Sequence, residues 1–185
     1  MYDANLPSVD HWFLCMRGEN TAVLIGDVEI GDDVAIFDNA VLRGDLNRIV
    51  VGNGSNIQDN ATFHTEVNHA TVIGEGVSVG HNAVVHGCEL MNNIIVGMGA
   101  IIMNGAKIPS GCVIAAGAVV KENFNCRENS LIAGLPAIVK READPLLHEY
   151  AQRNAQSYSV LRVKHLEGSF ARETGKTLKG RNTPT

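Results

Sequence analysis

The chain has 185 residues, a formal net charge of −5 and only 5% aromatic residues. It contains no long basic run that would indicate a nucleic-acid or anionic-membrane surface, and no stretch near the roughly 18 apolar residues of a membrane-spanning helix. Because the N-terminus lacks the pattern of a signal peptide, we expect a cytoplasmic protein whose four scattered cysteines are free thiols.

Residues 1–140 are predicted to form an all-β domain, a parallel β-helix with an N-terminal lead-in and coils over residues 20–122. Apolar residues recur every six positions, which matches neither an α-helix nor a simple alternating strand. Each hexapeptide would form one flat face, with Gly, Asn or Asp at the corners. Three faces close a coil of roughly 18 residues, and coils stack about 4.8 Å apart. The clearest columns are Leu24, Ile30, Ile36 and Leu42, and Val96, Ile102, Ile108, Ile114 and Val120.

Two breaks in this period predict loops. The step from Leu42 to Val51 is nine residues and the step from Phe63 to Ile73 is ten, so about three and four residues are additional. We place these loops at residues 43–48 and 65–70. Loops on a rigid scaffold often carry function.

Residues 141–167 are predicted to contain a C-terminal helix. Asp144 followed by Pro145 resembles an N-cap and a first helical residue, which favours a helix near 145–165. A mostly apolar stripe would pack against the coils or a neighbour: Leu147, Tyr150, Asn154, Tyr158, Leu161 and His165. Residues 168–185 have little to bury and are predicted to be a flexible tail.

Two histidines are predicted to stack on adjacent coils. His64 and His86 are 22 residues apart, and subtracting the four additional loop residues leaves 18, which is one coil. The two side chains should therefore lie roughly 5 Å apart at the same corner. Such a pair suits two ligands of one metal ion, with Zn²⁺ the first expectation and Fe²⁺ or Co²⁺ as alternatives.

His81 lies only five residues before His86 and should sit near the opposite end of a face, roughly 16 Å away along an extended chain. It cannot easily reach the same ion within one chain. A homotrimer would bring this corner of one subunit against the next, and His81 would complete the neighbour's metal site. Taken alone, each histidine could simply be hydrogen-bonded at a coil corner, but three together favour the metal site.

Four motifs resemble those of gamma-class carbonic anhydrases and their hexapeptide-repeat relatives. They are RGD at 43–45, NIQDN at 56–60, FH at 63–64 and GHNAVVHG at 80–87. The resemblance implies a left-handed β-helix trimer with a C-terminal helix and metal sites between subunits. It is strongest to the branch that contains the phenylacetate-degradation protein PaaY and the carnitine-operon protein CaiE.

The resemblance also implies roles for individual residues. His64 and His86 would be metal ligands from one chain, and His81 the third ligand from its neighbour. Gln58 would hydrogen-bond the metal-bound water, and Asn56 would lie close to the site.

Three charged residues would support this site by the same resemblance. Arg43 and Asp59 match an ion pair at the subunit interface, and Asp45 matches a supporting carboxylate. The family's best-known members carry a proton-shuttling Glu in a longer acidic loop, and here the short loop offers Glu66 and His69 as candidates.

The leading functional hypothesis is hydration of carbon dioxide to bicarbonate. A zinc ion on three histidines lowers the pKa of its water to about 7, and the resulting hydroxide attacks an electrophilic carbon. The same hydroxide acting on a thioester would make the protein an acyl-CoA thioesterase. Less favoured alternatives are a hexapeptide acyltransferase, which would need no metal, and a non-catalytic accessory protein.

Overall fold

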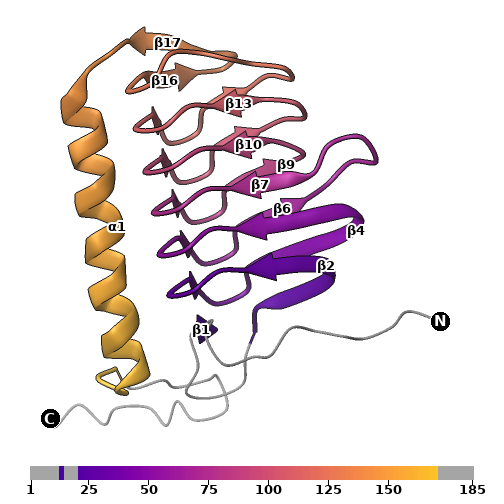
Figure 1. Cartoon of the computed structure of the whole chain (residues 1–185), viewed down its shortest axis with the longest axis vertical. Helices are drawn as coiled ribbons and strands as arrows, with labels where there is room; N and C mark the ends of the chain where they lie inside the picture. Colours follow the sequence, from indigo (N-terminus) through magenta and orange to yellow (C-terminus); the bar gives the residue numbers. More distant parts are fainter. Residues whose placement is uncertain (1–12, 15–20, 171–185) are drawn as a thin grey trace, which may run out of the picture.

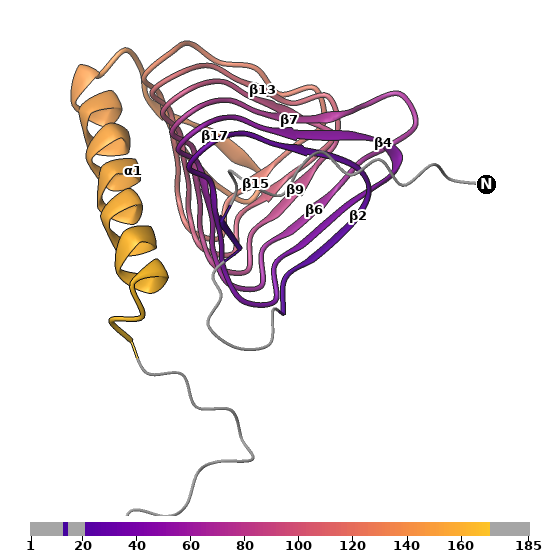
Figure 2. The same cartoon turned by 60° about the horizontal axis from the view of Figure 1, so that its bottom comes forward.

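The computed structural model describes residues 13–14 and 21–170. The chain winds through a stack of three-sided coils, and one long helix runs alongside the stack (Figures 1 and 2). The prediction of a parallel β-helix with a C-terminal helix is confirmed.

The strands of the described part are short, most of them two or three residues long. They are β1 (Phe13–Leu14), β2 (Val23–Ile30), β3 (Ala35–Ile36), β4 (Val41–Val51), β5 (Asn56–Ile57), β6 (Thr62–His64), β7 (Thr71–Ile73), β8 (Ser78–Val79), β9 (Val84–His86), β10 (Glu89–Leu90), β11 (Ile95–Val96), β12 (Ile101–Ile102), β13 (Lys107–Ile108), β14 (Val113–Ile114), β15 (Val119–Val120), β16 (Leu131–Gly134) and β17 (Ala137–Arg141).

The strands line up as three faces. Face 1 is an eight-stranded sheet in the order β1-β3-β5-β8-β11-β14-β16-β17, parallel except for the antiparallel β16–β17 pair. A nine-stranded sheet supplies the other two faces, because β2 and β4 are long enough to continue across a corner. We call the side with β6, β9, β12 and β15 face 2, and the side with β7, β10 and β13 face 3.

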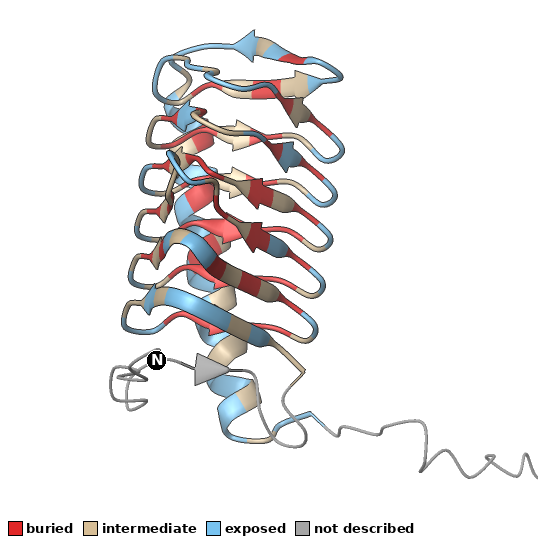
Figure 3. Ribbon diagram, turned by 90° about the vertical axis from the view of Figure 1, so that its right-hand side faces the viewer, coloured by how far each residue is buried: buried red, intermediate tan, exposed pale blue. Residues whose placement is uncertain are grey.

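The core lies inside the coils, where apolar side chains of successive coils stack in columns. On face 2 the inward column is fully buried and consists of Leu42, Phe63, Val85, Ile102 and Val120. Figure 3 shows buried residues along the walls and exposed residues at the corners. Burial of these columns is the main favourable contribution to folding.

The corners use left-handed backbone, as the sequence predicts. Asn60 and Asn82 stand at successive corners between faces 1 and 2, with φ of 60° and 58°. Asparagine adopts this conformation more readily than most residues, because its short polar side chain can hydrogen-bond to nearby backbone.

The predicted loop at 43–48 is wrong, because these residues belong to the continuous strand β4. Strand β4 pairs with β2 along its length, from Val41 opposite Val23 to Val51 opposite Ile30. The register of this pairing shifts between Gly26 and Val28. A bulge therefore absorbs the additional residues. The second loop, 65–70, is confirmed and projects between β6 and β7 (Figure 1).

The coils also extend beyond the predicted end at residue 122. Strand β16 pairs in parallel with β14, and Ile132 stacks on Ile114. These two residues are 18 apart, so the period continues although the intervening segment 121–130 forms no strand. The antiparallel strand β17 then covers this end of the stack.

The single helix of the described part is α1 (Pro145–Leu166), and Asp144 caps it by accepting a hydrogen bond from the Leu146 N–H at 3.0 Å. The predicted helix is confirmed, but the predicted apolar stripe is partly wrong, since Tyr150 is 57% exposed. Ala151 and Ala155 are buried instead. Ala155 packs at the Gly76 corner and His148 at the Gly111 corner, so α1 lies close to the coils.

The described helix lacks the apolar character that a membrane crossing would require. The predicted N-terminal lead-in, apart from β1, and most of the predicted tail lie outside the described residues.

Candidate metal centre

His64 and His86 end two neighbouring strands of face 2, and their backbones are direct partners in the parallel ladder. The Nδ1 atom of His64 lies 2.9 Å from Nε2 of His86. The ring centroids are 4.9 Å apart, with an angle of 67° between the ring planes. The predicted stacking of these two residues is therefore confirmed.

Each imidazole also has a partner on its other nitrogen. Nε2 of His64 lies 2.9 Å from Oδ1 of Asp45, and Nδ1 of His86 lies 2.6 Å from Oδ1 of Asn104. Such outer partners fix the ring orientation of metal-binding histidines. Asn104 was not among the predicted site residues, although it follows His86 by 18 residues, one coil, and this spacing could have revealed it.

Asp45 is also bound by Arg43, whose Nη1 lies 2.5 Å from Oδ2. The hydrogen bond from Arg43, followed by that from His64, holds the pKa of the Asp45 carboxyl below its usual value. Asp45 is therefore a carboxylate that can orient His64. The expected pairing of Arg43 with Asp59 does not occur within one chain.

His81 lies at the corner between faces 1 and 2, away from the His64–His86 pair. Its Nδ1 atom is 2.9 Å from Oδ2 of Asp59, which occupies the same corner position on the neighbouring coil. In the described residues of one chain, no group of three or more His, Cys, Asp or Glu side chains is placed to hold a metal ion. Within one chain, His81 therefore does not join the His64–His86 pair.

Asn56 and Gln58 are buried on face 1. Nε2 of Gln58 donates to Oδ1 of Asn56 at 3.2 Å, and Nδ2 of Asn56 donates to Oγ of Ser78 at 2.7 Å. This chain of hydrogen bonds fixes the orientation of both amides, with Gln58 near the His81 corner.

Tyr158 on α1 reaches the same place, a contact that the sequence analysis did not identify. Burial, and then the negative charge of Asp59, raise the pKa of the Tyr158 hydroxyl, while a hydrogen bond with Gln58 opposes the rise. Its ring packs edge-to-face on Phe37, with 5.9 Å between centroids. The helix thus contributes the Tyr158 phenol to the polar side chains around Gln58 and Asp59.

Glu66 and His69 close the 65–70 loop on itself. Their backbones exchange two hydrogen bonds of 3.0 and 2.9 Å, and the Glu66 carboxylate accepts from the Asn68 N–H at 3.1 Å. His69 lies over the Gly87 corner and lines a groove of about 510 Å³ with Arg48 and Lys107. The structure therefore brings neither residue into hydrogen-bond contact with the histidine pair.

Comparison with known proteins identifies the family. The chain is 47% identical over 140 residues to the probable carbonic anhydrase of Methanocaldococcus jannaschii, covering 76% of this chain and 88% of that protein. It is 36% identical over 151 residues to the mitochondrial gamma carbonic anhydrase 1 of Arabidopsis thaliana. The chain belongs to the gamma-class carbonic anhydrase-like family of hexapeptide-repeat proteins.

Within this gamma-class carbonic anhydrase-like family, the chain also matches the carnitine operon protein CaiE of Escherichia coli, with 39% identity over 142 residues, 76% of this chain and 72% of CaiE. The chain spans about half of the Arabidopsis protein, 55% of its length. No protein-family model matches the chain.

Among solved structures, a hexapeptide transferase family protein from Anaplasma phagocytophilum matches with a TM-score of 0.72 and 39% identity. The match covers 78% of this chain and 89% of that one. The fold of this gamma-class carbonic anhydrase-like chain is accordingly a left-handed parallel β-helix, as expected from the sequence.

The donor set fits a metal ion. Zinc–nitrogen bonds of about 2.0–2.1 Å in a tetrahedral site separate two ligand nitrogens by roughly 3.3 Å. The facing nitrogens of His64 and His86 are 2.9 Å apart, so a small rotation of the rings would admit an ion. The outer partners Asp45 and Asn104 are of the kinds that orient imidazole ligands.

Proposed function

We propose that the protein is a metal-dependent carbonic anhydrase that hydrates carbon dioxide to bicarbonate. The observation that carries this proposal is the stacked His64–His86 pair, with Asp45 and Asn104 on its outer nitrogens. The relationship to proteins named carbonic anhydrase supports the same activity. Zn²⁺ is the expected metal, with Fe²⁺ or Co²⁺ also compatible with imidazole ligands.

The surface of face 2 supports a shared site in a homotrimer. Its outward residues are apolar on several coils, and the exposed large apolar ones, at 38–44%, are Val23, Ile25, Ile101 and Met103, with the exposed Thr62 between them. By contrast, α1 covers part of face 1, and face 3 carries an outward ion pair between Glu89 and Lys107, 3.0 Å apart. An exposed apolar sheet face of this kind is typical of a protein–protein interface.

The positions of the histidines agree with this assembly. His81 lies at one edge of face 2 and the His64–His86 pair lies at the other edge. When face 2 packs against other copies, His81 of the partner subunit completes the set of three ligands. Three equivalent contacts would close a ring, as in other cyclic homo-oligomers.

The metal, when bound, supplies a Lewis acid that activates water at neutral pH. The protein's own residues hold and orient the reactants. Asn104 and Asp45 fix the histidine rings, and Asn56 holds the Gln58 amide so that it can orient the attacking water. The family resemblance further suggests Arg43 and Asp59 as an ion pair between subunits, and Glu66 as a proton acceptor once the loop faces a partner.

A second candidate is hydrolysis of an acyl-CoA thioester at the same site. The groove of about 510 Å³ beside the Gly87 corner supports it, because Arg48 and Lys107 could contact the phosphates of a large substrate. The 39% identity to the carnitine operon protein CaiE supports keeping a second candidate, because that relative is not named a carbonic anhydrase. This candidate needs the same metal site, so both activities should fall together when a ligand is removed.

One set of measurements on the purified full-length protein tests the proposal. We expect a trimer by light scattering, stoichiometric metal by elemental analysis, and carbon dioxide hydration by stopped flow that a chelator abolishes. A panel of acyl-CoA thioesters in the same assay separates the second candidate. A metal-free protein that transfers acyl groups, or a metal-loaded trimer without any turnover, would contradict the proposed activity.

A further inference from the structure

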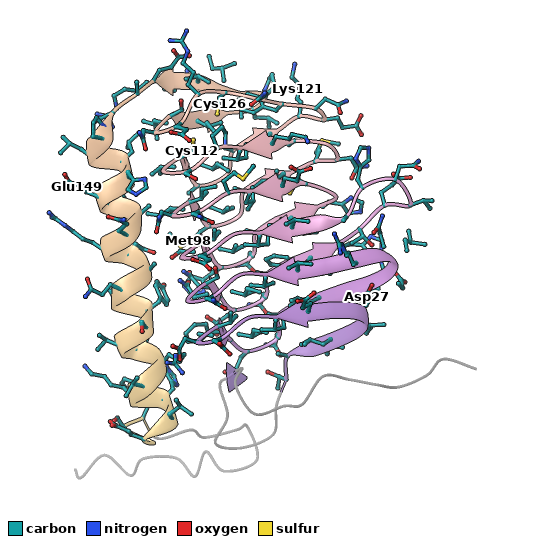
Figure 4. All side chains as sticks on the ribbon, in the orientation of Figure 1. Asp27, Met98, Cys112, Lys121, Cys126 and Glu149 are labelled. Atoms are coloured by element: carbon teal, nitrogen blue, oxygen red, sulfur yellow. The ribbon has the colours of Figure 1, made fainter. Side chains whose placement is uncertain are left out.

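Two cysteine side chains meet at the end of the coil stack farthest from β1. The Sγ atoms of Cys112 and Cys126 are 3.9 Å apart, and Figure 4 labels both residues near β16. Cys112 is fully buried just before β14, whereas Cys126 is partly exposed. A disulfide bond requires an Sγ–Sγ distance of about 2.05 Å, so closure needs a movement of roughly 2 Å.

The local backbone allows this movement. Cys126 lies in the 121–130 segment between β15 and β16, outside any strand. Asn125 forms an isolated parallel bridge with Lys107 of the coil below, but the Cys126 N–H itself donates to the Asn125 side chain at 2.8 Å and not to the ladder. Cys112, held by the coil, provides a fixed partner that Cys126 can approach.

We propose that Cys112 and Cys126 are a modification site, where a low-molecular-weight disulfide such as oxidised glutathione forms a reversible bond between them. Exchange at the accessible Cys126 forms a mixed disulfide and releases one glutathione. The Cys112 sulfur then attacks Cys126 Sγ and expels the second glutathione as a thiolate, which takes up the remaining proton. The two thiols lose two electrons and two protons, and one oxidised glutathione becomes two reduced molecules.

The surroundings of Cys112 favour its part in the second step. The Ser130 N–H donates to Cys112 Sγ at 3.5 Å, and the Cys126 thiol lies on its other side. In the reduced protein the hydrogen bond between the two thiols lowers the pKa of Cys112 and, as its counterpart, raises the pKa of Cys126. In the mixed disulfide Cys126 no longer carries a thiol proton, so the Ser130 N–H is the donor that remains to favour the Cys112 thiolate, the form that reacts in exchange.

The bond would tie the last coil to the segment that leads into β16. It closes a loop from residue 112 to 126, and loop closure of this length restricts the unfolded chain. Within the described residues, β16 and β17 are the strands that lie beyond this coil. Oxidation should therefore strengthen the end of the β-helix without touching the histidine pair.

Peptide mapping tests the proposal directly. Trypsin places Cys112 in residues 108–121 and Cys126 in residues 122–127, while Cys88 falls in 49–107. After the full-length protein is incubated with oxidised glutathione, we expect the first two peptides to be joined, with a loss of two hydrogens that dithiothreitol reverses. The buried Cys88 should stay unmodified and serves as an internal control.

Thermal unfolding provides a second measurement that does not depend on catalytic activity. Oxidation should raise the midpoint of the wild-type protein by roughly 6–12 °C. Cys126→Ser, in a partly exposed position, should fold normally and show neither the joined peptides nor the shift. A glutathione adduct that persists on Cys126, or a bond between Cys126 residues of two chains, would overturn the proposal.

Discussion

The facing ring nitrogens of His64 and His86 lie 2.9 Å apart, although 22 residues separate them in the chain. Strands β6 and β9 pair in parallel and place both residues at the same rung position, after the inward pair Phe63 and Val85. The pair is therefore a product of the coil repeat and of one loop of the right length. Its geometry can be tested by substitutions that leave the coil intact.

Replacing either member of the pair should remove metal and activity together. His86→Ala deletes one proposed ligand without disturbing the buried column, since the His86 side chain points outward from face 2. We expect metal content near zero and a loss of carbon dioxide hydration of at least about 100-fold. Elemental analysis and stopped flow measure the two effects. His69→Ala, in the neighbouring loop, is the matched control and should keep its metal.

Asn104 should tune the site without being a ligand. Its Oδ1 atom holds Nδ1 of His86 at 2.6 Å, so Asn104→Ala should weaken metal binding about 10- to 100-fold. Competition with a coloured chelator measures this affinity. Asn104→Asp keeps an oxygen acceptor and should recover most of the loss, whereas equal loss in both variants would indicate a purely structural role.

Sharing of the site between subunits predicts complementation. His81→Ala and His86→Ala should each be inactive as homotrimers, because every site then lacks one ligand. In mixed trimers formed from equal amounts of both chains, roughly one quarter of the sites should combine an intact half from each chain. Hydration activity should rise accordingly on co-expression. A mixture as inactive as its parents would show that His81 does not complete a partner's site.

The apolar surface of face 2 should hold the subunits together. Ile101 points outward there and is 38% exposed in a single chain. Ile101→Glu would bury a charge at the interface, which is costly without a partner, so the trimer should dissociate by light scattering. Val72→Glu makes the same change on face 3 and should leave the trimer intact. If Ile101→Glu stays trimeric, face 2 is not the interface.

Cys88 should make stability fall at alkaline pH. Burial raises the pKa of its thiol from 9.0 to about 12. Between these values the unfolded chain releases a proton that the folded chain keeps, so the free energy of unfolding decreases by about 1.4 kcal/mol per pH unit from this group. Below pH 9 this slope vanishes.

Urea unfolding at pH 8, 10 and 11 measures this effect. Cys88→Ala lacks the ionising group, so it should be less stable at pH 8 because of its cavity but should lose less stability on the way to pH 11. Parallel pH dependences in the two proteins would contradict the assignment to Cys88.

Much of the site follows from the sequence because the coil repeat is regular. A period of six fixes which residues point inward, and a coil length of 18 predicts that His64 and His86 stack. The same arithmetic could have found Asn104 and the additional coil at Ile132, since each is 18 residues from its partner. The sequence also predicts α1 from Asp144 and Pro145, because capping is a local property of the chain.

Other features depend on contacts that the repeat does not encode. Residues 43–48 have the composition of a loop, yet β2 provides a partner along which β4 continues, and pairing with hydrogen bonds on a neighbouring strand overrides local preference. Tyr158 reaches Gln58 only because α1 turns back along the coils, which the amphipathic pattern of the helix could not specify.

The sequence by itself determined the coil, its inward columns and the stacking of two imidazoles, because parallel strands repeat one register and every coil places the same position at the same corner. Only the tertiary structure decided the side-chain contacts that the repeat does not encode. Asp45 faces His64, Asp59 pairs with His81, and the Cys112 and Cys126 sulfurs approach each other, because side-chain direction and the path of irregular segments follow from packing rather than from period.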